Sequence, residues 1–143
     1  PYTVQATMRK VHGRLHEGYG VVLGGDPLDA AENEQRYTYF LVRGDGSYLL
    51  KRRSGAETPL IRGWTFHPAI GRDTEEGGET NRLTVRVGAA EVSFQVNGEE
   101  VARIPSGEID VRGIPGLRVA HDIELRVSDF RVTAAAPAIR PPE

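Results

Sequence analysis

Four polar residues that could perform acid–base chemistry cluster near the start of the chain: His12, Arg14, His16 and Glu17. In an extended segment His12 and His16 point to the same side, and Glu17 is close enough to polarise an imidazole. A histidine beside a carboxylate at the mouth of a cleft suits hydrolysis or elimination. Metal binding would need a third ligand, such as His121. We therefore take His16 and Glu17 as the candidate catalytic pair, and the ligand spacing predicts no metal site.

A second group combines aromatic rings with guanidinium groups on one predicted hairpin. Residues 36–43 (RYTYFLVR) and 47–53 (SYLLKRR) flank Gly44-Asp45-Gly46, which has the composition of a tight turn. If Asp45 and Gly46 are the two turn residues, Tyr39 lies opposite Arg52. One face then carries Tyr37, Tyr39, Arg43, Tyr48 and Arg52, with Trp64 at its rim, while Phe40 and Val42 face the core. A different loop length would shift this register by one residue and exchange the face assignment.

This tyrosine face has two interpretations. Sugars present flat C–H surfaces and rings of hydroxyl groups, which aromatic platforms and arginine side chains both match. Stacked tyrosine and arginine side chains also complete half-exposed sheets that bind nothing. The face, extended by the edge at Tyr19, is therefore either a carbohydrate-binding surface or ordinary surface packing.

The elements that must position these groups are strands, and the stretch from Asn81 to Ile104 shows this most clearly. Its apolar residues alternate with polar ones, first at Leu83, Val85 and Val87 and then at Val92, Phe94 and Val96. Asn97-Gly98 then supplies the two positive-φ residues of a type I′ hairpin. Strands with one apolar face need a second sheet to cover it, so the chain is predicted to form a β-sandwich.

The rest of the chain fits a single all-β domain. Strand-like patterns recur at residues 2–11, 19–23, within 58–66 around Leu60 and Ile61, and at 116–121 and 123–132, separated by turn-rich segments, which gives about ten strands and almost no helix. A one-turn helix over residues 30–34 would be too short to be stable alone. We predict one sandwich domain over residues 1–133, followed by an Ala- and Pro-rich tail over 134–143.

The composition of the chain limits the classes of partner and cofactor that it is expected to bind. The 143 residues include 18 basic and 20 acidic side chains, for a net charge of −2, and these are scattered along the chain. Such a balance predicts neither nucleic-acid binding nor membrane insertion. The chain has no cysteine, which excludes disulfides, a thiol nucleophile and cysteine-bound metal. The acidic residues of the loop after strand 19–23 could bind Ca²⁺, but they lack any dedicated ligand spacing, and no cofactor is predicted.

Taken together, these segments resemble a known group of folds. The hairpin with its Asp-Gly turn, GWTFHPAI (residues 63–70), residues 81–104, GIPGLRVAH (113–121) and SDFRV (128–132) are similar to concanavalin A-like lectin and glucanase jelly rolls. More narrowly, they resemble bacterial 3-keto-disaccharide hydrolase-like domains, over Tyr2 to Val132. The resemblance implies an antiparallel jelly-roll sandwich. Because members of that family are usually exported, it also implies a periplasmic or secreted protein whose signal peptide has been removed.

The resemblance also implies an enzymatic alternative. Glucanases of this type place paired carboxylates on one strand as E-x-D-x-E. Residues 108–112 (EIDVR) begin this motif, but Arg112 stands where the second glutamate belongs, so retaining glucanase chemistry is not expected. A hydrolase acting on a sugar derivative would instead use His16 and Glu17, with Arg36, Arg53 or His121 orienting the substrate.

The sequence thus favours a non-catalytic carbohydrate-binding module that uses Tyr19, Tyr37, Tyr39, Arg43, Arg52 and Trp64. Two alternatives stay open: a sugar-active hydrolase, and a structural adhesion module in which the same face meets a protein or a second copy of the chain. The sugar and the oligomeric state do not follow from the residues.

Overall fold

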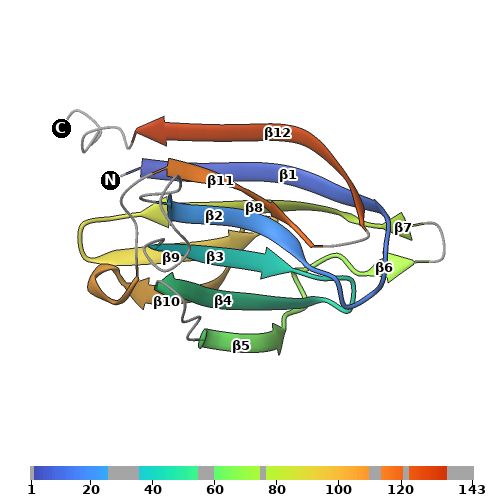
Figure 1. Ribbon diagram of the computed structural model, residues 1–143, viewed down its shortest axis with the longest axis horizontal. Coiled ribbons are helices and arrows are strands. Elements are labelled where there is room, and N and C mark those ends of the chain that lie inside the picture. The colour runs from blue at the N-terminus through green and yellow to red at the C-terminus, as the bar shows by residue number, and fades with distance from the viewer. Residues whose placement is uncertain are drawn as a thin grey trace.

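The computed structural model of the chain describes residues 2–25, 36–54, 60–74, 77–109, 114–120 and 123–134 (Figure 1). These residues form twelve strands and one 3₁₀ turn, η2 (Ser106–Glu108). The strands are β1 (Tyr2–His12), β2 (Tyr19–Gly25), β3 (Arg36–Val42), β4 (Ser47–Ser54), β5 (Leu60–Phe66), β6 (Asp73–Thr74), β7 (Gly77–Gly78), β8 (Thr80–Val87), β9 (Glu91–Val96), β10 (Glu99–Pro105), β11 (Ile114–Val119) and β12 (Glu124–Ala134).

Two five-stranded antiparallel sheets stack on each other (Figure 1). Sheet A has the strand order β10-β9-β8-β1-β12, and sheet B has the order β11-β2-β3-β4-β5. A short hairpin, β6-β7, lies at one end. The predicted all-β, antiparallel sandwich is confirmed. None of the described segments is a helix long and apolar enough to span a membrane.

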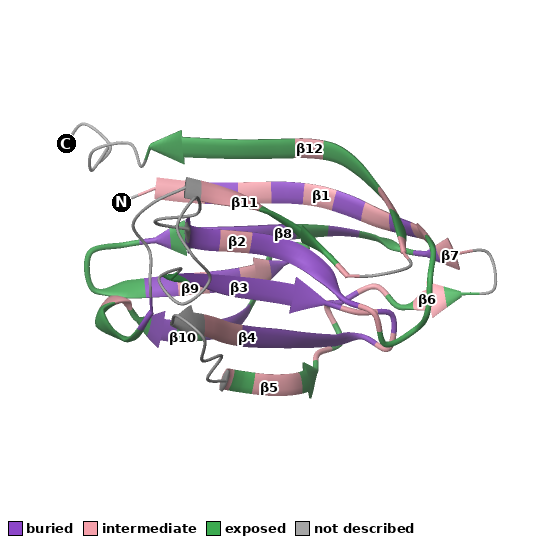
Figure 2. Ribbon diagram, in the orientation of Figure 1, coloured by how far each residue is buried: buried purple, intermediate pink, exposed green. Residues whose placement is uncertain are grey.

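The core lies between the sheets and follows the alternation in the sequence. In sheet A the inward residues include Val4, Ala6 and Met8 of β1 and the predicted apolar positions of β8 and β9 (purple in Figure 2). Phe40 of sheet B meets Phe94 of sheet A edge-to-face, with ring centres 5.2 Å apart. Each large apolar side chain buried in this way contributes about 1.5–3 kcal/mol to stability.

The hairpin predicted at Asn97-Gly98 is also confirmed. Both residues have positive φ, 53° and 88°. The side-chain Oδ1 of Asn97 accepts a hydrogen bond from the backbone N–H of Arg82 at 2.8 Å, which ties the turn to β8. Positive φ at two successive positions matches the right-handed twist of the flanking strands β9 and β10.

The turn between β3 and β4 differs from the prediction. It has three loop residues, Gly44 to Gly46, because the N–H of Arg43 donates to the carbonyl of Ser47 (3.1 Å) and that of Gly46 donates to the carbonyl of Arg43 (3.1 Å). Gly46, with φ of 85°, takes the left-handed position that a three-residue loop requires.

This longer loop shifts the register by one residue, so the predicted pairing of Tyr39 with Arg52 is wrong. Tyr39 instead lies opposite Lys51, and Arg52 lies opposite Thr38. Arg52 therefore shares the side of Phe40, not the side of Tyr39. Tyr48 moves into the core, where its hydroxyl donates to the carbonyl of Val101 at 3.0 Å. Phe40 and Val42 face the core as predicted.

Candidate functional site

The predicted tyrosine face forms the outer surface of sheet B. Tyr37, Tyr39, Leu41 and Leu49 make a cluster separate from the core, and Val22 and Trp64 pack against it. Because side chains alternate along β3, these residues project away from Phe40 and Val42. The tyrosines are more covered than predicted: Tyr37 is 8 % and Tyr39 5 % exposed. We call this surface the outer B face. Its accessible parts include Trp64 and the arginine side chains at its rim.

One aromatic–arginine stack lies where β3 and β5 end. The guanidinium carbon of Arg43 lies 4.1 Å from the centre of the Trp64 ring. The edge of the same ring reaches Gly18, where an added Cβ would lie 3.0 Å from the indole. Arg43 is mostly covered and Trp64 is half-buried. Packing against Arg43, Gly18 and the outer cluster restrains the indole, and the guanidinium is attracted electrostatically to the face of the ring.

A second aromatic–arginine stack lies on the same face, between β11 and β3. Arg118 of β11 is exposed, and its guanidinium carbon lies 4.7 Å from the centre of the Tyr39 ring. In the strand register it lies opposite Gly20 of β2, which has no side chain. Tyr39 lies on β3 and Trp64 on β5, two strands apart in sheet B, so the two rings are separated by roughly 10 Å across the sheet.

Asp45 holds the first stack in place. The Nε of Arg43 donates to both Asp45 oxygens at 3.2 Å, and its Nη2 lies 3.1 Å from Oδ2. Burial alone would raise the pKa of Asp45, but the hydrogen bonds from Arg43 and Ser47 outweigh it and lower the pKa below its ordinary value. Asp45 is therefore an anionic hydrogen-bond acceptor beside the Arg43–Trp64 stack.

His16 approaches the same carboxylate. Its Nε2 lies 3.8 Å from Asp45 Oδ2, and the His16 side chain is exposed. Glu17, the predicted partner of His16, is half-buried, and among the described residues it forms no ion pair with His16. The predicted catalytic role of His16 and Glu17 stays a prediction.

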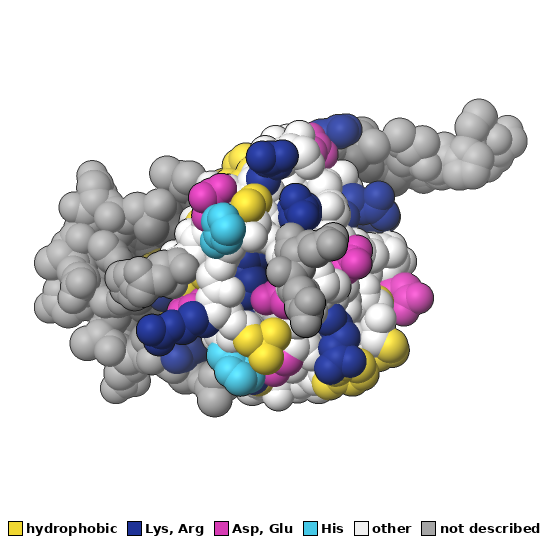
Figure 3. Space-filling view, turned by 90° about the vertical axis from the view of Figure 1, so that its right-hand side faces the viewer, with side chains coloured by type: hydrophobic (Ala, Val, Ile, Leu, Met, Phe, Trp, Pro, Cys, Tyr) yellow, Lys and Arg dark blue, Asp and Glu magenta, His cyan; other side chains and the backbone are white. Residues whose placement is uncertain are grey.

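A buried ion pair connects the loop that carries His16 to the turn that carries Asp45. Lys10 Nζ lies 2.6 Å from Asp73 Oδ2 and donates to the carbonyl of Arg14 at 2.7 Å. The N–H of Asp73 donates to the carbonyl of Gly44 (2.8 Å), and the N–H of Gly44 donates to the carbonyl of Leu15 (3.0 Å). The loop and the turn are thus held at one end of the sandwich. Figure 3 shows this end, where basic, acidic and histidine side chains are interspersed.

Other predicted ligand-binding residues lie elsewhere. Tyr19 is in the core, where its hydroxyl accepts a hydrogen bond from Asn81 Nδ2 at 3.0 Å and burial raises its pKa, so the predicted role of Tyr19 at an open edge is wrong. Arg36 is exposed at the start of β3, on the side of Phe40 by alternation. The side chain of Arg53, the whole of His121, the acidic loop and residues 30–34 lie outside the described residues.

Sequence reasoning missed two residues, Asp45 and Arg118. Asp45 was interpreted only as a turn residue, although an aspartate two residues after an arginine could have indicated a local ion pair. Arg118 gave no signal, because its contact with Tyr39 depends on β11 pairing with β2, a pairing between distant segments.

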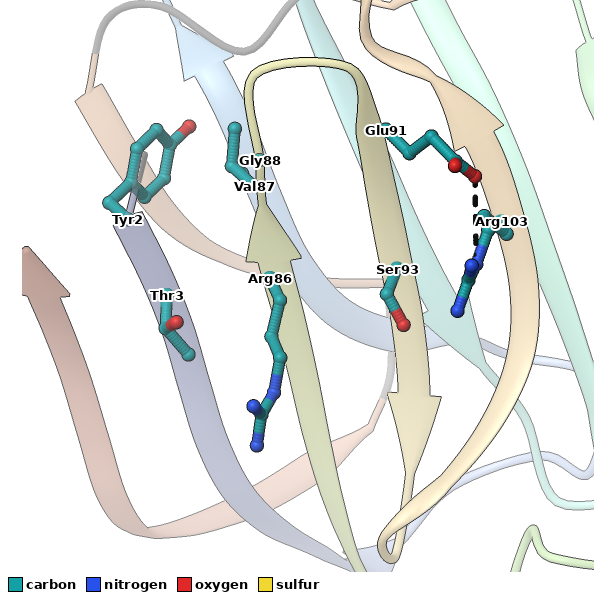
Figure 4. A pocket seen from close by; sticks show the side chains of 8 residues that line it. All are labelled: Tyr2, Thr3, Arg86, Val87, Gly88, Glu91, Ser93 and Arg103. Carbon is teal, nitrogen blue, oxygen red and sulfur yellow. Dashed lines mark ion pairs between the residues drawn. The ribbon is translucent and has the colours of Figure 1, made fainter. Parts of the chain in front are cut away.

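A groove lies on the other sheet (Figure 4). It has a volume of about 390 Å³ and is lined by Tyr2, Thr3, Arg86, Val87, Gly88, Glu91, Ser93 and Arg103. Arg103 is balanced by Glu91 (3.6 Å) and Glu100 (3.0 Å). A smaller pocket of about 150 Å³ adjoins Lys10 and Asp73. Neither hollow includes an aromatic–arginine stack, and no group of three or more metal-binding side chains gathers within the described ranges.

Comparison with known proteins supports the fold. No protein-family model matches the sequence, and no curated protein does. Among solved structures, a carbohydrate-binding module, CBM66 from Bacillus subtilis, superposes with a TM-score of 0.65 at 12 % identity, over 93 % of this chain and 74 % of that one. Sheep galectin-11, in complex with glycerol, gives 0.62 at 12 % identity, over 92 % and 88 %. CG-16, a homodimeric agglutinin from chicken liver, gives 0.54 at 13 % identity, over 92 % and 90 %.

These similarities support the two-sheet antiparallel β-sandwich. They do not extend to the narrower hydrolase-like family that the sequence resembles, and at such low identity they concern the fold alone.

Proposed function

We propose that the protein is a carbohydrate-binding module whose ligand lies along the outer B face, between the Arg43–Trp64 and Arg118–Tyr39 stacks. The observation that carries this proposal is the first stack with Asp45 beside it. There an indole is held by packing, an arginine lies over it, and a carboxylate acceptor fixes the arginine. Pre-organised groups of this kind lose little conformational freedom when a ligand binds.

The chemistry of these groups suits a sugar. The bonds to Asp45 use Nε and Nη2 of Arg43, which leaves the Nη1 side of the guanidinium to donate to sugar hydroxyl oxygens. Asp45 accepts hydrogen bonds from sugar hydroxyls, and the accessible part of Trp64 packs against sugar C–H groups. A separation of roughly 10 Å between the two rings is longer than one sugar ring, so an oligosaccharide is the expected ligand. Two of the similar structures are, by their names, a carbohydrate-binding module and an agglutinin.

A glycan array followed by calorimetry tests the proposal. Arg43→Ala and Arg118→Ala should each weaken binding by about tenfold or more, because each removes a charge-assisted hydrogen bond and a ring contact. Arg86→Ala is the matched control, since Arg86 is an exposed arginine on the outer face of sheet A and should bind like wild type. Binding to no glycan, or equal affinities for all three variants, would refute the proposal.

One observation keeps the hydrolase as a second candidate. His16 beside Asp45 places an imidazole next to the proposed sugar site. In that case keto-sugars or glycosides should be turned over, and His16→Ala or Glu17→Gln should abolish turnover while glycan binding persists. Binding without turnover supports the non-catalytic module.

A further inference from the structure

Strand β12 forms one edge of sheet A, and its outer edge is unpaired in the described part of the chain. It is 11 residues long, ELRVSDFRVTA, and contains neither proline nor lysine, two of the devices that commonly protect sheet edges. Ser128 is bulged, since Thr7 pairs with Asp129 and Met8 with Val127. The bulge keeps Val127 and Phe130 on the same side of the strand. A long edge with open backbone groups is suited to pair with another strand.

The inner side of this edge is apolar. Val132, Phe130 and Val127 pair with core-facing residues of β1, so they point inward, past the rim of sheet B. On β11, the corresponding edge of sheet B, Leu117 and Val119 pair with the core residues Val21 and Tyr19. Both edges lie at the same side of the sandwich, at the top of Figure 1. The seam formed by Leu117, Val119, Val127, Phe130 and Val132 is between 38 and 48 % exposed at each position.

The outer side of β12 carries charges with an unusual arrangement. Arg126 lies opposite Arg9 of β1 in the strand register, so its cross-strand neighbour is a like charge, although the Arg9 Nε itself donates to the carbonyl of Gly78 at 3.1 Å. Asp129 and Arg131 follow on the same side, joined by an ion pair of 3.0 Å. An acidic group on the open edge of β12, opposite Arg126, would offset the repulsion from Arg9.

A second copy of β12 supplies that group in one register only. If two β12 strands pair antiparallel with Val127 opposite Ser128 of the partner, Arg126 faces the partner's Asp129. Glu124 then faces the partner's Arg131, and each pair occurs twice by symmetry. On the inner side Leu125 faces the partner's Phe130, so apolar groups also match.

Neighbouring registers are unfavourable. A shift of one residue places outward side chains opposite inward ones. A shift of two, with Val127 opposite the partner's Phe130, places Arg126 opposite the partner's Arg131, which are like charges. The sequence of β12 is therefore self-complementary in hydrogen bonding, apolar contact and charge at the same register.

We propose that the protein is a homodimer in which β12 pairs antiparallel with β12 of a second copy, joining the two A sheets and covering the seam. This inference is independent of the proposed function. It leaves both outer B faces open, so a dimer would present two binding faces and gain avidity for clustered ligands.

Sedimentation of the full chain from about 1 µM to about 1 mM tests association, over a range that spans weak to moderate dimers. Wild type should dimerise. Arg126→Glu and Asp129→Arg should each raise the dimer dissociation constant by roughly tenfold or more, because each creates like-charge pairs twice per dimer. The double variant Arg126→Glu/Asp129→Arg should restore the affinity. Arg86→Glu, on the outer face of the central strand β8, is the matched charge control and should not change it.

Folding of Arg126→Glu is not at risk, since the side chain is exposed and the change places an acidic group opposite Arg9. An unchanged β-sheet circular dichroism spectrum and a cooperative thermal transition confirm this, whereas the transition temperature itself falls if a dimer is lost. A register test uses the absence of native cysteine: Leu125→Cys/Phe130→Cys should form covalent dimers on oxidation, whereas Val127→Cys/Phe130→Cys should not. A wild type that stays monomeric at every concentration overturns the proposal. So does a dimer that is indifferent to the charge swap.

Discussion

The Lys10–Asp73 pair gives the sharpest prediction on how the fold supports the site. Lys10 is 2 % exposed and Asp73 16 % exposed. Asp73→Asn leaves the more deeply buried ammonium without a counter-charge, so it should lower the free energy of unfolding by about 3–5 kcal/mol. Lys10→Met leaves the better solvated carboxylate unpaired, and should cost only about 1–3 kcal/mol.

The double variant Lys10→Met/Asp73→Asn separates the pair from other effects. It removes both charges, so its cost should be smaller than that of Asp73→Asn alone, and the coupling between the two sites should be about 1–3 kcal/mol. Urea unfolding at neutral pH, followed by circular dichroism, measures all three variants. Costs that simply add, or an Asp73→Asn cost below about 1 kcal/mol, would contradict the reasoning. Because the pair anchors the loop and turn next to Arg43, glycan affinity should also fall in Asp73→Asn.

Three further predictions follow from single residues. Because the pKa of Asp45 lies below its ordinary value, its carboxylate stabilises the fold above about pH 4, and this contribution is lost as the pH falls further. The difference in unfolding free energy between wild type and Asp45→Asn, measured in urea, should therefore shrink between about pH 6 and about pH 3. A constant difference would count against the Arg43–Asp45 bond. Asn81→Leu removes the hydrogen-bond partner of the Tyr19 hydroxyl and of the Gly71 backbone, so it should lower the free energy of unfolding by about 2–5 kcal/mol in the same assay. Gly98→Ala should cost about 1–2 kcal/mol because φ there is 88°, whereas Gly107→Ala, at a position with no atoms nearby, should cost little.

The sandwich could be predicted because burial on one face dictates the alternation of side chains. The pattern at Leu83, Val85 and Val87 admits only a strand with one buried side, and Asn97-Gly98 fits a two-residue turn. The length of the turn at Gly44 to Gly46 was ambiguous, because a two-residue loop and a three-residue loop would each make a hairpin. The observed three-residue loop places Tyr48 in the core, where its hydroxyl donates to the carbonyl of Val101, 53 residues away in the sequence.

The candidate site was predictable only in part. The position of Trp64 at the rim of the tyrosine face, and Arg43 on that face, followed from the alternation of side chains along the predicted strands. The burial of Tyr19 was not predictable, since its partner Asn81 lies on the opposite sheet. Asp45 and Arg118 depend on local turn geometry and on the pairing of β11 with β2, and neither leaves a periodic signal in the sequence.

Trp64 offers the most direct test of the outer B face as the sugar site, because it is the chain's single tryptophan. The measurement is its fluorescence during titration with a glycan identified on the array, with Arg43→Ala as the comparison. A ligand lying over the stack should change the emission saturably, at the midpoint found by calorimetry, and protect Trp64 from acrylamide quenching. Glycan binding by calorimetry with unchanged Trp64 emission and quenching would place the ligand elsewhere and contradict the account.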